Sequence, residues 1–215
     1  MTQALTFYTH PMSRGRTVRW MLEECGATYD TVVLDYGTSM KADAYLAINP
    51  MGKVPALRHG TVVVTEQAAI CAYLADLFPG KNLAPSPGSE ARGAYYRWLF
   101  FAAAPMEAAF MGKSMGLLAP SDKSRQMGYG SYENVLDTVE GAVSQAQPYL
   151  CGDRFSAVDL YLAAALDFGL RTGGIEKRPA FERYVQPILQ REARVRAAAI
   201  DDELLKSHPL PANRA

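Results

Sequence analysis

The sequence has few cysteines and no excess of either charge, and both features exclude whole classes of protein. The three cysteines, Cys25, Cys71 and Cys151, are far apart and form no CxxC motif. This pattern argues against a disulfide scaffold and a zinc site, and it fits a reducing compartment. Lysine and arginine total 22, as do aspartate and glutamate. Because binding to a phosphate backbone needs a basic excess, nucleic acid is not expected as the main partner.

Long hydrophobic runs are absent as well. No apolar stretch approaches the roughly 20 residues needed to cross a bilayer. The first four residues lack the charged and then apolar pattern of a secretory signal. The composition, 49% hydrophobic and 20% charged, can still bury a core. We therefore expect a soluble cytoplasmic protein without a membrane partner.

The first eighty residues mix strand and helix signals in the order β-α-β-α-β-β-α. Apolar and β-branched runs predict strands at 5–8, 29–34, 55–58 and 61–65, and a helical turn is expected at 43–48. Two apolar stripes with i, i+3, i+4, i+7 spacing predict helices; they contain Val18, Met21, Leu22 and Cys25, and Ile70, Tyr73, Leu74 and Leu77. Pro55 stands at the head of a predicted strand, although proline cannot donate to a strand ladder.

The second part of the chain carries helix signals only. Proline and glycine cluster between Phe78 and Ser89 and predict a linker at 81–88. Helices are predicted at 89–113, at 122–147 and from about 179, the last with a kink at Pro187. We thus expect an α/β domain at 1–80 and an all-α domain at 89–215, with a loosely held tail after Lys206.

The segment FSAVDL contains the best local signal. Ser156 is placed to cap a helix, and Asp159, three residues on, is placed to reach back to the N–H group of the cap. Phe155 and Leu160 fit the hydrophobic staple that accompanies such a capping box. This pattern predicts a helix start and carries no chemistry.

Three segments resemble the cytosolic glutathione transferase family. They are NPMGKVPAL at 49–57, TEQAAICAYLAD at 65–76 and YLCGDRFSAVDLYLAAAL at 149–166. With this order and spacing the resemblance covers nearly the whole chain. It implies a thioredoxin-like N-terminal domain that binds glutathione, a helical domain that binds an electrophile, a homodimer, a role in detoxification and no metal. No class within the family is assigned.

The resemblance also implies how glutathione would bind. A cis Val54–Pro55 bond would turn the backbone of Val54 outward, where the cysteinyl unit of glutathione could pair like an added strand. Glu66 would hold the ammonium group. The N–H groups at the helix start would hold the γ-glutamyl carboxylate. Gln67 stands where the family usually has serine, which leaves its side-chain contact open.

The glycyl carboxylate would need a cation. Lys53 and Lys41 lie in loops that flank the proposed site. We favour Lys53.

The chemistry requires a thiolate, and a free thiol has a pKa of about 8.5. Ser13, near the first helix start, is placed where family members often use a hydroxyl donor. Tyr8, at the end of the first strand, fits the tyrosine-type register, in which Arg14 would supply the charge. In the serine-type register the hydroxyl would fall on Met12, so the donor stays open between Ser13, Tyr8 and a backbone or water group.

The electrophile would lie between the loop after the first strand and the first long helix. The residues expected to line that pocket are His10, Met12, Tyr96, Phe100, Met106, Phe110 and Met111.

Other functions are compatible with the same scaffold. A glutathione-dependent disulfide oxidoreductase needs a cysteine after the first strand. This chain has Pro-Met-Ser-Arg at 11–14, so that function is not favoured. A glutathione-using isomerase, lyase or dehalogenase cannot be separated by sequence from a transferase, because the fold does not fix the second substrate. A non-catalytic binding or regulatory protein is a further alternative, and the two features that point to it are Gln67 and Met12.

Overall fold

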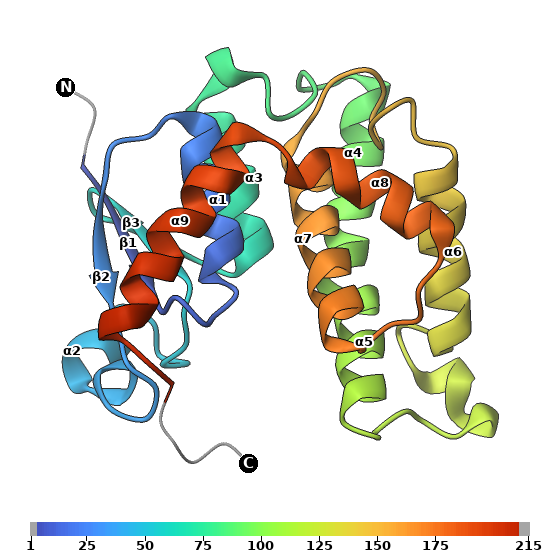
Figure 1. The fold of residues 1–215 in the computed structure, drawn as a ribbon, viewed down its shortest axis with the longest axis horizontal. Coiled ribbons are helices and arrows are strands. Elements are labelled where there is room, and N and C mark those ends of the chain that lie inside the picture. Colours follow the sequence, from blue (N-terminus) through green and yellow to red (C-terminus); the bar gives the residue numbers. More distant parts are fainter. Residues whose placement is uncertain (1–3, 211–215) are drawn as a thin grey trace. The chain divides into compact units, whose positions relative to one another are not determined.

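The computed structural model describes residues 4–210, which form two compact units (Figure 1). The N-terminal unit consists of residues 4–77 together with 191–210, and the helical unit consists of residues 78–190. Within the described residues, no helix is both long enough and apolar enough to span a membrane.

The N-terminal unit contains a four-stranded mixed sheet in the order β2-β1-β3-β4. Strand β1 (Leu5–Thr9) runs parallel to β2 (Tyr29–Val33) and antiparallel to β3 (Ala56–His59), and β3 runs antiparallel to β4 (Val62–Thr65). The predicted thioredoxin-like class is confirmed. The third strand begins at Ala56 and not at Pro55, in line with the inability of proline to donate to a ladder.

Helices α1 (Gly15–Cys25) and α3 (Gln67–Leu77) cover one face of this sheet (Figure 1). The short helix α2 (Asp43–Leu46) follows a 3-10 turn at Ser39–Lys41. The two predicted apolar stripes supply much of the core, because their buried members are Val18, Met21, Leu22, Cys25, Ile70 and Leu74. Tyr73 and Leu77 lie at the edge of that core and are partly exposed.

Helix α9 (Glu192–Ser207) differs from the expected arrangement. We expected residues 89–215 to form one helical domain, but α9 packs along α1 in the N-terminal unit (Figure 1). Local periodicity predicts that a helix forms, but it does not predict which other element the helix packs against. The last five residues of the expected tail, 211–215, lie outside the described residues.

In the helical unit, the long helix predicted at 89–113 is interrupted. Helix α4 (Glu90–Phe101) passes through a π-helical turn at Ala102–Met106 into α5 (Glu107–Ser114). Pro105 lies inside this turn. Because proline removes an N–H donor and clashes with the preceding turn, it accounts for the wider winding.

The helix predicted at 122–147 is shorter than expected. Residues Ser121–Gln126 form a 3-10 turn, and α6 runs over Tyr132–Ser144. Gly130 has a φ of 69°, a left-handed conformation that separates the two segments. Helices α7 (Ala157–Thr172) and α8 (Pro179–Leu189) follow, and Pro187 lies close to the end of α8.

The capping box at the start of α7 is confirmed. The fully buried carboxylate of Asp159 accepts hydrogen bonds from the backbone N–H of Ser156 at 2.9 Å and from its hydroxyl at 2.8 Å. It also accepts from the Leu150 N–H at 2.8 Å and the Tyr184 hydroxyl at 2.7 Å. One side chain thus joins α7, α8 and the loop before α7.

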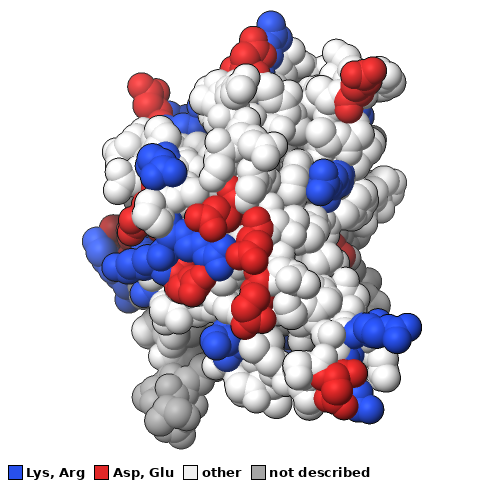
Figure 2. Space-filling model, turned by 90° about the vertical axis from the view of Figure 1, so that its right-hand side faces the viewer, with Lys and Arg blue, Asp and Glu red and all other residues white. Residues whose placement is uncertain are grey.

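Charges on the surface are interleaved. On the face drawn in Figure 2, lysines and arginines lie beside aspartates and glutamates. Arg178, at the start of α8, illustrates the pattern through hydrogen bonds at 2.8 Å to both Asp137 and Glu140. Such mixing fits the formal net charge of +0.

Candidate functional site

Three strand ends meet at one edge of the sheet. Tyr8 of β1 is paired with Ala56 of β3, and Ala56 is paired with Thr65 of β4. The chain beyond these partners therefore leaves the sheet on the same side. This register brings together the loop after β1, the Val54–Pro55 segment and the start of α3.

The Val54–Pro55 peptide bond is cis, as predicted. Both ladders of β3 end at Ala56, so the backbone of Val54 lies beyond the last paired residue. The segment is fixed from the other side, because the carbonyl of Lys53 accepts from the Tyr45 hydroxyl at 2.6 Å and from the Asn49 amide at 2.8 Å. Val54 can thus offer backbone groups from a firmly held segment.

Tyr45 and Asn49 were not selected from the sequence. Both side chains are buried, and both act on the carbonyl of Lys53. Their only sequence signal is that they lie close to Val54–Pro55 in the chain. Asn49 is the first residue of the segment NPMGKVPAL, and Tyr45 precedes it. An interaction with a backbone carbonyl leaves no residue pattern that could have identified them.

Glu66 has an unusual backbone conformation at the start of α3. Its φ is 65°, in the left-handed region that non-glycine residues rarely adopt, and its carbonyl accepts from the N–H of Ile70 at 2.9 Å. Such a conformation costs roughly 1–3 kcal/mol and is concentrated at functional sites. The side chain is exposed and has no ion-pair partner among the described residues. The first N–H groups of α3, from Gln67 onward, have no intrahelical acceptor.

The loop after β1 is closed by hydrogen bonds to His10. The carbonyl of His10 accepts from the Ser13 N–H at 2.9 Å and from the Ser13 hydroxyl at 2.6 Å, and its ring Nδ1 accepts from the Met12 N–H at 3.1 Å. His10 is only 1% exposed, and burial lowers the pKa of its imidazole. We expected this ring to line a pocket, but it is buried and holds the loop together.

The two candidate hydroxyl groups differ in their surroundings. Tyr8 is buried in a cluster with Leu34 and Met40, and its ring centroid lies 5.6 Å from that of Tyr45. Ser13 lies in the loop and is partly exposed, and its oxygen accepts from the Gly15 N–H at 2.9 Å. Arg14, also partly exposed, directly precedes α1.

The two candidate lysines also differ. The ammonium group of Lys41 donates to the carbonyl of Met51 at 3.1 Å. Lys53 is exposed, and no acid pairs with it within residues 4–210. Lys53 is therefore the more available cation at this edge.

The candidates of the helical unit are divided between surface and core. Tyr96, Phe100 and Met111 are exposed, and Phe110 is partly exposed, with its ring 6.3 Å from that of Tyr132. Met106 is 0% exposed, so it packs in the core and does not line a surface. Met12, in the loop after β1, is 47% exposed.

The chain matches two parts of a known family. Residues 12–77 match the N-terminal domain of glutathione S-transferase, and residues 106–192 match its C-terminal domain. The glutathione S-transferase GstA of Escherichia coli O157:H7 is 31% identical over 170 residues, which cover 74% of this chain and 82% of the relative.

Solved structures agree with these matches. A glutathione transferase from Methylococcus capsulatus superimposes with a TM-score of 0.77 at 30% identity, covering 93% of this chain and 99% of the other. A sphingomonad glutathione S-transferase in complex with glutathione gives a TM-score of 0.74 at 29% identity, with coverages of 92% and 98%. The protein therefore belongs to the glutathione S-transferase family.

Proposed function

We propose that the protein binds glutathione where β1, β3 and β4 end, and activates its thiol for attack on a small apolar electrophile. One observation carries this proposal: the unpaired backbone of Val54 lies at the same sheet edge as Glu66, whose conformation is strained. A similar structure, that of the sphingomonad enzyme, contains glutathione.

Each part of glutathione has a matching group at this edge. The cysteinyl backbone would pair with Val54 like an added strand. The γ-glutamyl carboxylate would meet the free N–H groups and positive dipole end of α3, and Glu66 would hold the neighbouring ammonium group. Lys53 would meet the glycyl carboxylate. Gln67 would contribute its backbone N–H.

Activation requires a lower thiol pKa. Lowering it by two units from about 8.5 takes about 2.7 kcal/mol of preferential stabilisation of the thiolate. The Ser13 hydroxyl would supply part of it by turning from the His10 carbonyl to the sulfur, and Arg14 would add positive charge. The thiolate then forms a C–S bond to the electrophile, whose leaving group departs with its electron pair. Homodimer formation, a cytoplasmic location and a detoxification role remain predictions.

Glutathione binding can be tested by titration calorimetry. We expect saturable binding in the millimolar range or tighter, and turnover of a chlorodinitrobenzene-type electrophile. Glu66→Gln should weaken binding about tenfold, or about 1.4 kcal/mol, because it removes the charge opposite the ammonium group. Glu90→Gln is the matched control, since Glu90 is also an exposed acid at a helix start. Absence of binding would contradict the proposal, and binding without turnover would favour a non-catalytic protein.

The donor to the thiolate can be assigned from the thiolate absorbance of bound glutathione. Ser13→Ala should raise the thiol pKa by about one unit, equivalent to about 1.4 kcal/mol, and Ser13→Thr should restore most of it because the hydroxyl is kept. Tyr8→Phe should leave the pKa unchanged, since its phenol lies in a buried cluster. A raised pKa in Tyr8→Phe alone would reverse the assignment.

A further inference from the structure

Helices α1 and α9 are joined by four ion pairs. Along α1 two arginines precede two glutamates, and in α9 and at its N-cap, Arg191, arginines likewise precede two aspartates. The helices run antiparallel, so each group meets its opposite. The pairs are Arg16 with Asp202, Arg19 with Asp201, Glu23 with Arg196, and Glu24 with Arg191.

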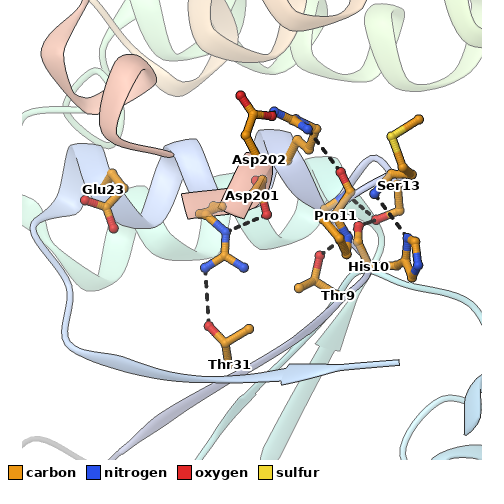
Figure 3. Close-up of polar contacts among 12 residues, drawn as sticks. Thr9, His10, Pro11, Ser13, Glu23, Thr31, Asp201 and Asp202 are labelled. Carbon is orange, nitrogen blue, oxygen red and sulfur yellow. Dashed lines mark hydrogen bonds and ion pairs between the residues drawn. The ribbon is translucent and has the colours of Figure 1, made fainter. Parts of the chain in front are cut away.

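Arg16 continues this line of ion pairs into the loop after β1. One guanidinium nitrogen, Nη2, is bonded to the Asp202 carboxylate, and the other, Nη1, donates to the carbonyl of Pro11 at 3.2 Å (Figure 3). A single side chain thus connects α9 to the segment between His10 and Ser13.

The geometry of the loop explains why this contact matters. The carbonyl of His10 already accepts from Ser13, and the adjacent carbonyl of Pro11 accepts from the Arg16 side chain. At the helix start, a Cβ atom on Gly15 would lie 2.0 Å from the Thr9 hydroxyl. The first turn of α1 therefore packs directly on the end of β1.

The residue after α9 makes a second link. His208 Nδ1 lies 3.1 Å from the carboxylate of Asp35, and the same carboxylate lies 4.0 Å from Nε2 of His10. The C-terminal segment is thus linked to the loop after β1 at a second point, through Asp35.

We propose that Arg16 and Asp202 are positioning residues, through which α9 fixes the loop that carries Ser13. The contact between Ser13 and the thiol of glutathione rests on the proposed function. The positioning of the loop by Arg16 does not. The Arg16 and Asp202 side chains are 31% and 64% exposed. Exposed pairs contribute little to global stability, so loss of this pair should move the loop without unfolding the protein.

Hydrogen exchange of the glutathione-free protein tests the hold on the loop. Asp202→Ala should speed exchange of the Met12, Ser13 and Gly15 amides at least threefold. Arg196→Ala is the control, because it removes an exposed ion pair of the same two helices far from the loop. Unchanged exchange in Asp202→Ala, or equal acceleration in Arg196→Ala, would overturn the proposal whether or not glutathione binds.

A charge reversal separates loop positioning from the attachment of α9. The double variant Arg16→Glu with Asp202→Arg restores an ion pair between the helices, but a carboxylate at position 16 cannot donate to the Pro11 carbonyl. We expect a thermal stability close to that of the wild type. Exchange of the loop amides should be as fast as in Asp202→Ala, and the thiol pKa of bound glutathione should lie above its wild-type value. Return of both loop exchange and thiol pKa to wild type would show that Arg16 acts only by attaching α9.

Discussion

Asp159→Ala is expected to lower the free energy of unfolding by about 4 kcal/mol. The substitution strands the N–H groups of Leu150 and Ser156 and the hydroxyls of Ser156 and Tyr184, all of which donate to the buried carboxylate. Each buried group left without a partner costs roughly 1–3 kcal/mol, partly recovered by relaxation. The melting temperature should fall by about 10 °C, which scanning calorimetry and urea titration can measure.

Two further variants define the origin of this loss. Tyr184→Phe removes one of the donors and should cost about 1 kcal/mol. Asp153→Ala changes an exposed aspartate in the loop before α7 and should stay within about 0.5 kcal/mol of wild type. A loss below about 1 kcal/mol in Asp159→Ala would show that this carboxylate does not hold the helices together. Asp159→Asn serves as the conservative variant if the alanine variant does not fold.

Asp201→Ala is expected to destabilise the protein by about 3 kcal/mol. The Arg19 and Asp201 side chains are each 1% exposed and bond at 2.8 Å, so removal of the acid leaves a buried guanidinium without its counter-charge. Arg19 keeps its contacts at 3.2 Å with the hydroxyls of Tyr29 and Thr31, which do not neutralise it. Urea unfolding should show the loss.

The double replacement Arg19→Met with Asp201→Leu should recover stability to within about 1 kcal/mol of wild type. Arg19 Nη2 and Asp201 Oδ2 have no hydrogen-bond partner among the described residues, so the ion pair is incompletely satisfied and an apolar pair can replace it. The neighbouring exposed pair is the control, since Asp202→Ala should cost less than about 1 kcal/mol. A double variant that is as unstable as Asp201→Ala would contradict this account.

Features that depend on a few adjacent residues can be predicted from the amino-acid sequence. The strand and helix order of the first eighty residues follows from periodicity and β-branched runs. The capping box of Ser156 and Asp159 follows from a spacing of three residues, because one helical turn brings those backbone and side-chain groups into contact. The cis bond at Pro55 followed from the resemblance of a short segment.

Which side of each helix or strand is covered, and by which element, follows only from the three-dimensional packing. Periodicity gave no sign that α9 would pack on α1. Its ion pairs join residues more than 150 positions apart in the sequence; Arg19 and Asp201, for instance, are separated by 182 positions. His10 and Met106, both expected at a pocket, are buried. Burial is set by all the elements that pack around a side chain, and so it cannot be read from the residues next to it.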